Sequence, residues 1–391
     1  ELAQFVATSP SLSAAVENEF VQPVGQEQTQ DEITARIEYL IVDQKQLNIF
    51  YSLDSEAYTN MEATPRVSSA DGKPLQGYGL SSDSYGAENG ELRRATLDFS
   101  EGTMPDVLTF ILEVYDNGQK PDAHTTPPEE NYTAPPEFVI EDSTFQDYEP
   151  PETLAHFSFS LFFDPAFTSK GEILQLNQDF ELDGQKLTLI SAEIYPTALY
   201  LTFDAAEENS AWLKSLSLYV ENEKGQRFGG VANGVSALGT TDSPMMATYL
   251  LESPFFSKNK KLNLVITGAD WLDKDKERIH LDLKNKTADW LPRGVTFTGA
   301  DQHSEGWLLH FLVECEDGIH RQFWSWTYFD AEGREYSITS FSTSSAYGHE
   351  QSEDLDEVRL VLKDYHKDEV WLCPSFTRRT ELETPVNIAI K

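Results

Sequence analysis

Alternating apolar and polar residues mark the first clear element of the chain, at residues 33–53. The alternation is interrupted by a polar turn at residues 43–46. A period of two on both sides of a short turn is typical of a half-buried β-hairpin. The same layout returns at residues 186–204 and 294–314. The pattern therefore predicts three units that each contain such a hairpin near their start.

Two further features recur in the three predicted units. Each unit has a turn in which glycine is followed by a basic or amide residue, at residues 71–73, 224–226 and 332–334. Each unit also ends on a short alternating strand, at residues 157–163, 279–283 and 386–390. Short strands with regular turns and almost no helical periodicity are typical of β-sandwiches. We therefore predict an all-β fold of three immunoglobulin-like β-sandwich units in series.

These repeats also predict the boundaries of the units. After an N-terminal segment and linker at residues 1–30, the three sandwiches are expected at residues 31–169, 170–292 and 293–391. The first sandwich contains a proline-rich insertion at residues 116–153. Because proline removes ladder donors and fixes the backbone, this insertion is predicted to be a long loop. A loop of this length is either a mobile insertion, which we prefer, or a binding loop.

Charge excludes one class of partner. The chain of 391 residues carries 29 basic and 66 acidic side chains, a net charge of −37. Such a field repels phosphate backbones and anionic lipid, so we expect no nucleic-acid binding. The acidity has two interpretations, namely solubility or the capture of cations at a surface, and solubility is the simpler one.

The two cysteines, Cys315 and Cys373, are too few for a disulfide-dense scaffold or a cysteine-based zinc site. Both fall on predicted strands of the last third of the chain. They could form one disulfide, but we prefer two free buried thiols, because a free cysteine behaves as a small hydrophobic residue.

The sequence contains no recognised catalytic motif. It has no H-E-x-x-H pair, no G-x-S-x-G elbow, no phosphate loop and no dinucleotide fingerprint. The S-x-x-K letters at residues 257–260 lie in a polar turn without companion motifs, and we interpret them as chance. We therefore predict a non-enzymatic protein that needs no cofactor and no metal.

Two metal sites stay open as alternatives. A hairpin could bring His310 and His320 together, but no third ligand is evident and a cross-strand pair is the simpler reading. Alternate acidic residues on a loop can present oxygens to one calcium ion. Such residues stand at Asp270, Asp273, Asp275 and Glu277. Interleaved lysines and the lack of the EF-hand glycine argue against calcium there.

An aromatic strand at residues 323–328 supplies the candidate ligand-binding residues. By alternation, Trp324, Trp326 and Tyr328 are expected on one face. If exposed, that face could stack on sugar rings or bind a partner protein. If buried, it is core, which is the more common place for tryptophan in a sandwich strand.

Several segments resemble a known family. Residues 9–16, where Ser9 could cap a short helix, and the hairpin 33–53 resemble uncharacterised ectodomains of Gram-positive single-pass membrane proteins. Residues 171–203, with the turn DGQK at 183–186 and YPT at 195–197, resemble the usual second, immunoglobulin-like domain of that family. The third predicted unit matches by general pattern only.

The resemblance implies a location and a role. Members carry one transmembrane helix before the ectodomain, so residues 1–30 would be the membrane-proximal segment. No apolar run of the sequence is long enough to span a bilayer. Because the chain starts at Glu1 without a methionine, we expect the anchor upstream. Members also resemble the extracytoplasmic part of anti-sigma factors. The family has no established catalytic residues, so the resemblance implies none in this chain.

We therefore expect a non-enzymatic sensor or regulatory ectodomain at the cell surface, with an extracellular protein or a cell-wall glycan as partner. The alternative is a surface adhesion module. It would bind glycan or protein through residues 324–328 or through the proline-rich loop.

Overall fold

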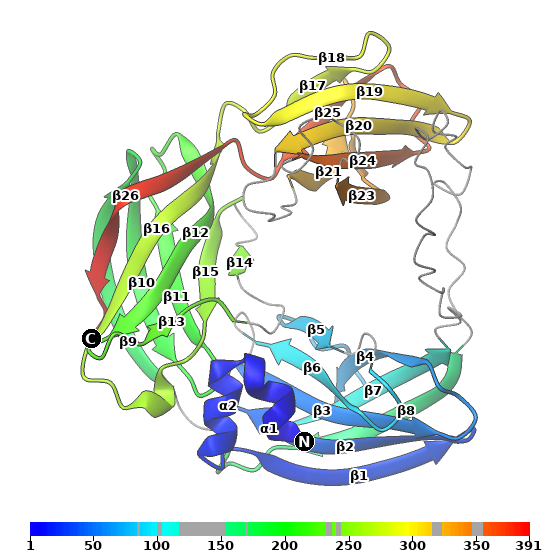
Figure 1. Cartoon of the computed structure of the whole chain (residues 1–391), viewed down its shortest axis with the longest axis vertical. Coiled ribbons are helices and arrows are strands. Elements are labelled where there is room, and N and C mark those ends of the chain that lie inside the picture. The colour runs from blue at the N-terminus through cyan, green and yellow to red at the C-terminus, as the bar shows by residue number, and fades with distance from the viewer. Residues whose placement is uncertain are drawn as a thin grey trace, which may run out of the picture.

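The structure is a computed structural model of the whole chain. It describes residues 1–83, 87–99, 104–116, 153–168, 171–231, 237–239, 244–314, 323–345 and 355–391. The described residues form several antiparallel sheets with two short α-helices at the N-terminus (Figure 1). The predicted all-β fold with several sandwiches is confirmed. No helix in these ranges is long and apolar enough to cross a membrane.

The first sandwich packs a five-stranded sheet of order β1-β2-β3-β6-β5 against the sheet β4-β7-β8. The strands are β1 (Gln22–Gln30), β2 (Ile33–Val42), β3 (Gln46–Ser55), β4 (Met61–Ser69), β5 (Gly79–Asp83), β6 (Leu92–Asp98), β7 (Val107–Asp116) and β8 (Thr153–Phe162). The predicted first hairpin is β2–β3. The predicted linker is wrong in part, because residues 22–30 are the edge strand β1. Its side chains are mostly polar because an edge strand faces solvent.

A bulge in β2 changes which residues face the core. The register between β2 and β3 shifts between Ile37 and Tyr39. Strict alternation would put Tyr39 and Ile41 on the same face as Ile37, whereas the bulge turns Leu40 inward instead. Tyr39 and Ile41 then lie under the N-terminal helices, where a second apolar cluster forms. Both faces of the hairpin are therefore buried.

The N-terminal helices cover the outer face of this sheet. They are α1 (Leu2–Phe5), the 3₁₀ turn η1 (Val6–Thr8) and α2 (Pro10–Glu17). Ser9 caps α2, as predicted, and its hydroxyl accepts a hydrogen bond from the backbone of Leu12. Leu12 joins one apolar cluster with Phe50, whose ring lies 5.9 Å from that of Phe5 on the face of β3 that points away from the sandwich core.

The second sandwich packs the sheet β14-β15-β11-β10-β9 against β13-β12-β16-β26. Its elements are β9 (Glu172–Leu182), β10 (Gln185–Ile194), β11 (Leu199–Ala205), β12 (Ala211–Asn222), β13 (Arg227–Phe228), β14 (Ala237–Gly239), β15 (Met246–Leu251), η3 (Phe255–Ser257), β16 (Leu262–Asp273) and β26 (Arg378–Ala389). Trp271 is fully buried in its core. The predicted second hairpin is β10–β11.

The third sandwich packs β18-β17-β25-β21-β22 against β19-β20-β24-β23. Its strands are β17 (Ile279–Asp282), β18 (Thr287–Ala288), β19 (Val295–His303), β20 (Gly306–Glu314), β21 (Trp324–Phe329), β22 (Glu335–Ser337), β23 (Ser340–Ser345), β24 (Leu355–Lys363) and β25 (Glu369–Pro374). The predicted third hairpin is β19–β20.

Two closing strands do not lie where the sequence placed them. Residues 279–283 were expected to close the second sandwich, but β17 pairs with β25 and contributes to the third core. Residues 386–390 were expected to close the third sandwich, but β26 pairs with β16, and Ile388 lies in the second core. Alternation shows that a strand is half-buried, but it does not show which sheet the strand joins.

The three repeated turns share one backbone conformation. They span residues 69–73, 222–226 and 330–334, and the fourth residue of each is a glycine with φ of 81°, 76° and 77° respectively. In each, the first residue donates its N–H to the carbonyl of the fifth, and the glycine N–H donates to the carbonyl of the first. Glycine is required because side chains rarely adopt positive φ. The shared turn supports the internal repeat.

Candidate ligand-binding site

Strand β21, which carries the candidate aromatic residues, has an irregularity in its pairing with β25. Trp324 pairs with Pro374 and Tyr328 pairs with Leu372 on β25. Three β21 residues therefore stand opposite the single residue Cys373, which is a bulge in the ladder. Trp326 lies in the middle of this bulge. A bulge can re-aim side chains, but Trp324 and Trp326 still line the same pocket.

The three candidate residues differ in exposure. Trp324 and Tyr328 are 3% and 1% exposed, whereas Trp326 is 48% exposed. The sequence placed the three residues on one face; Trp324 and Trp326 line the same pocket, and the greater exposure of Trp326 reflects its place at the border of that pocket. Trp324 packs on Phe311 with ring centroids 4.6 Å apart, and Tyr328 stacks on Tyr336 at 5.2 Å. Burial raises the pKa of Tyr328, consistent with a hydroxyl held inside a core.

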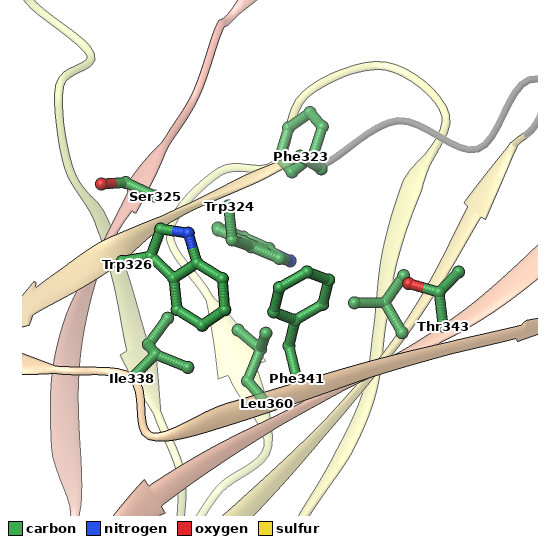
Figure 2. Close-up of a pocket in the computed structure, with 9 residues that line it drawn as sticks. Phe323, Trp324, Ser325, Trp326, Ile338, Phe341, Thr343 and Leu360 are labelled. Carbon is green, nitrogen blue, oxygen red and sulfur yellow. The ribbon is translucent and has the colours of Figure 1, made fainter. Parts of the chain in front are cut away.

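Trp326 borders a pocket between the two sheets of the third sandwich (Figure 2). Its ring lies 4.8 Å from that of Phe341 in an edge-on arrangement. The backbone N–H of Ile338 donates to the carbonyl of Trp326 over 2.8 Å, which places Ile338 beside it. The lining residues are Phe323, Trp324, Ser325, Trp326, Ile338, Phe341, Thr343, Val358 and Leu360.

The lining determines what this pocket could hold. Its cavity volume is about 10 Å³, roughly the space of one water molecule. The polar side-chain groups in the lining are the hydroxyls of Ser325 and Thr343 and the indole N–H groups of Trp324 and Trp326, and none of the lining side chains is charged. Tryptophan offers a flat apolar surface with a polar N–H. The exposed face of Trp326 at the border, rather than the small cavity itself, could therefore stack on an apolar side chain or on the face of a sugar ring.

The two alternative metal sites take other roles in the described residues. His310 Nε2 lies 3.0 Å from Asp301 Oδ2, while His320 lies outside the described residues. Asp270 receives two hydrogen bonds from Arg379, at 2.7 and 3.2 Å. Asp273 receives one from Arg378 at 3.0 Å. Within the described ranges, no group of three His, Cys, Asp or Glu side chains could hold a metal ion.

The cysteine and loop predictions stay open. Cys373 is half-buried on β25, and burial raises the pKa of its thiol. Cys315 and residues 117–152, the main part of the proline-rich insertion, lie outside the described residues.

The structure also contains a buried polar contact between the first and second sandwiches that the sequence did not indicate. We name it the polar joint, and its carboxylates are Asp43, Asp98 and Glu252. Thr197 donates to Asp43 Oδ2 from its N–H at 2.9 Å and its hydroxyl at 2.6 Å. Tyr200 donates its hydroxyl to Asp98 Oδ2 at 2.6 Å. Glu252 accepts from the backbone of Ser11 at 2.6 Å.

These three carboxylates are buried, at 0%, 1% and 4% exposure. Burial raises the pKa of Asp43 although its four hydrogen-bond donors oppose the shift. A buried carboxylate is stable only when it is hydrogen-bonded, so the two sandwiches fix each other's orientation. The alternation of apolar and polar residues along a strand does not indicate such contacts between distant residues.

Comparison with known proteins adds one partial match. Residues 171–293 match a family of unknown function, DUF5643. This stretch covers β9 to β18 of the structure and does not include β26. A search of curated proteins found no match. Among solved structures, the conserved domain protein from Bacillus anthracis matches with a TM-score of 0.44 and 14% sequence identity, over 69% of this chain and 84% of that one.

Proposed function

We propose that this chain is a non-enzymatic, extracytoplasmic region of a membrane-anchored bacterial protein that works as a sensor or regulatory ectodomain. In this proposal the third sandwich recognises an extracellular ligand, and the first two sandwiches form the platform that carries it. The location rests on the family resemblance of residues 9–16 and 33–53. The match of residues 171–293 adds a domain of unknown function and no role of its own.

The observation that carries the recognition role is the exposure of Trp326. A large aromatic side chain that is 48% exposed beside an apolar pocket costs solvation free energy in the free protein. A ligand that covers it recovers that free energy. Trp324 also lines the pocket, whereas Tyr328 serves recognition indirectly as part of the core of the same sandwich.

Substitution of Trp326 tests this role. Trp326→Ala should weaken binding of the ligand about tenfold, because stacking on a tryptophan contributes about 1 kcal/mol beyond area. Phe162→Ala is the matched control, since Phe162 is an exposed aromatic on β8 of the first sandwich. The probes are a panel of purified cell-wall glycans and cell-surface proteins of the source bacterium, measured by titration calorimetry. Equal binding by the wild type and Trp326→Ala would reject the pocket as the site.

The surface adhesion module is the second candidate, and the same pocket favours it. A reporter for extracytoplasmic stress genes separates the two roles. A sensor with Trp326→Ala should change the reporter response, whereas an adhesin should lose attachment and leave the reporter unchanged. The sequence upstream of this chain tests the anchor. A cleavable signal peptide without a membrane helix would exclude it.

A further inference from the structure

Two strands of the second sandwich continue directly into the third. β16 leads through residues 274–278 into β17, and β25 leads through residues 375–377 into β26. β16 pairs with β26, and β17 pairs with β25, in both cases antiparallel. The four strands therefore form one two-stranded ribbon that runs through both sandwiches (Figure 1). We name residues 274–278 and 375–377 the crossing segments.

The crossing is held by specific contacts rather than by a loose linker. The backbone N–H of Thr377 donates to the carbonyl of Trp271 at 2.7 Å. The backbone N–H of Asp273 donates to the Thr377 hydroxyl at 2.9 Å. Arg378 donates to Asp273 Oδ1 at 3.0 Å and also pairs with Asp183 of the second sandwich. Because these groups are half-buried, the crossing is more rigid than an exposed connection.

The Trp326 pocket touches this crossing through Phe323. Phe323 lines the pocket, and its carbonyl accepts a hydrogen bond from the N–H of Ser375 at 2.7 Å. Its ring lies 5.2 Å from that of Phe376 in an edge-on arrangement. The Phe376 ring in turn lies 5.1 Å from the Arg379 guanidinium.

Arg379 completes the connection to the second sandwich. Its guanidinium makes a bidentate ion pair with Asp270 on β16, with Nε 2.7 Å from Oδ1 and one terminal nitrogen 3.2 Å from Oδ2. Two parallel hydrogen bonds of this kind fix the orientation of both groups. The next residue on β16, Trp271, is fully buried in the second core. Contacts thus run without a gap from the pocket to that core.

We propose that the Trp326 pocket and the second sandwich are energetically coupled through Phe323, Phe376, Arg379 and Asp270 at the crossing. Through this coupling, a ligand bound at the pocket would change the stability of the second sandwich. The use of the coupling for sensing rests on the proposed function. Two strands cross rather than one, so a rotation of the third sandwich must shift the pairing of β16 with β26. A ligand that orders Phe323 then stabilises this pairing.

Hydrogen exchange in the full chain without ligand tests the coupling directly. Phe376→Ala should speed exchange about fivefold or more in β21 and also in β16 and β26, because the ring joins Phe323 to Arg379. Phe297→Ala is the matched control, since Phe297 is a partly buried ring packed on the third core at β19. It should speed exchange in the third sandwich and leave β16 and β26 at wild-type rates.

The result that overturns the proposal is an effect of Phe376→Ala confined to the third sandwich. If that variant fails to fold, Phe376→Leu keeps most of the volume without the ring face, and the same comparison applies. Because no ligand is used, failure here leaves ligand binding at Trp326 standing. Conversely, a pocket that binds nothing leaves the measured coupling unaffected.

Discussion

The side-chain amide of Gln28 pairs with the backbone of Ser158 as a neighbouring strand would. Its Nε2 donates to the Ser158 carbonyl at 2.6 Å, and its Oε1 accepts from the Ser158 N–H at 3.3 Å. Gln22 pairs with the backbone of Phe162 and Asp164 in the same way. Glutamines of β1 thereby satisfy the outer edge of β8, which would otherwise offer unpaired backbone groups to another chain.

Removal of these amides should free that edge. We expect the double substitution Gln26→Ala and Gln28→Ala to promote self-association, since Gln26 donates to the carbonyl of Ser160 at 3.1 Å. The loss of stability should be about 1 kcal/mol or less per exposed hydrogen bond. Analytical ultracentrifugation measures the association. Thr29→Ala on the same strand is the control, because Thr29 bonds within the hairpin to Thr34, and equal association by both variants would reject the role.

Asp330 should make the third sandwich sensitive to acid. Burial alone would raise the pKa of its carboxyl, but hydrogen bonds from Lys367, the backbone of Arg334 and the Tyr336 hydroxyl outweigh burial and lower it well below its usual range. An acid with a lowered pKa in the folded state stabilises the fold above its unfolded pKa of about 4. That contribution is lost as the pH falls through the folded pKa.

Asp330→Asn should therefore lower the melting temperature of the third sandwich at pH 7, and the difference from wild type should shrink below about pH 4. Calorimetric melting curves across this pH range measure both. Asp282→Asn is a control at an exposed turn, where the lowered pKa of Asp282 comes from Asn285. A difference between Asp330→Asn and wild type that does not change with pH would contradict the assignment.

The polar joint can be tested with two tyrosines. Tyr200→Phe removes the hydroxyl that donates to the buried Asp98, and should cost about 1 to 3 kcal/mol because a buried carboxylate loses a donor. Tyr249→Phe is the matched control, since in the described part of the chain the Tyr249 hydroxyl is buried without a hydrogen bond. It should be neutral or stabilising, as measured by urea unfolding. The opposite order of effects would argue against the joint.

The fragment of residues 171–293 should not fold by itself, although it spans the match to the family of unknown function. It lacks β26, so Leu264 and Ile266 on β16 lose their partners Ile388 and Val386. The freed edge and the uncovered core should cause unfolding or aggregation. Circular dichroism with a chain of residues 171–391 as control measures this. A cooperative transition in the short fragment would show that β26 is dispensable.

Much of the local structure could be predicted from the sequence. The three hairpins and the shared glycine turns follow from period-two alternation and from backbone positions that require positive φ. Both are properties of neighbouring residues. The Ser9 cap of α2 is local in the same sense.

What could not be predicted depends on residues far apart in the chain. Alternation does not show how exposed a residue is: Trp324 is buried and Trp326 is half-exposed because Trp326 lies at the border of the pocket that both residues line. The exchange of partners by β17 and β26 depends on which sheet each strand meets, and an alternating pattern at residues 279–283 or 386–390 does not specify that sheet. The contact between Tyr200 and Asp98 joins two sandwiches and leaves no periodic trace.

The ribbon also bears on how such a chain can change over evolutionary time. Asp273 and Arg378 lie side by side where the chain leaves the second sandwich and returns to it. Insertion, loss or replacement of everything between them would leave the ends of the second sandwich in place. The third sandwich is thus a single excursion of the chain between two neighbouring residues of the second sandwich, and a change confined to it would leave the contacts that hold the first two sandwiches together unaltered.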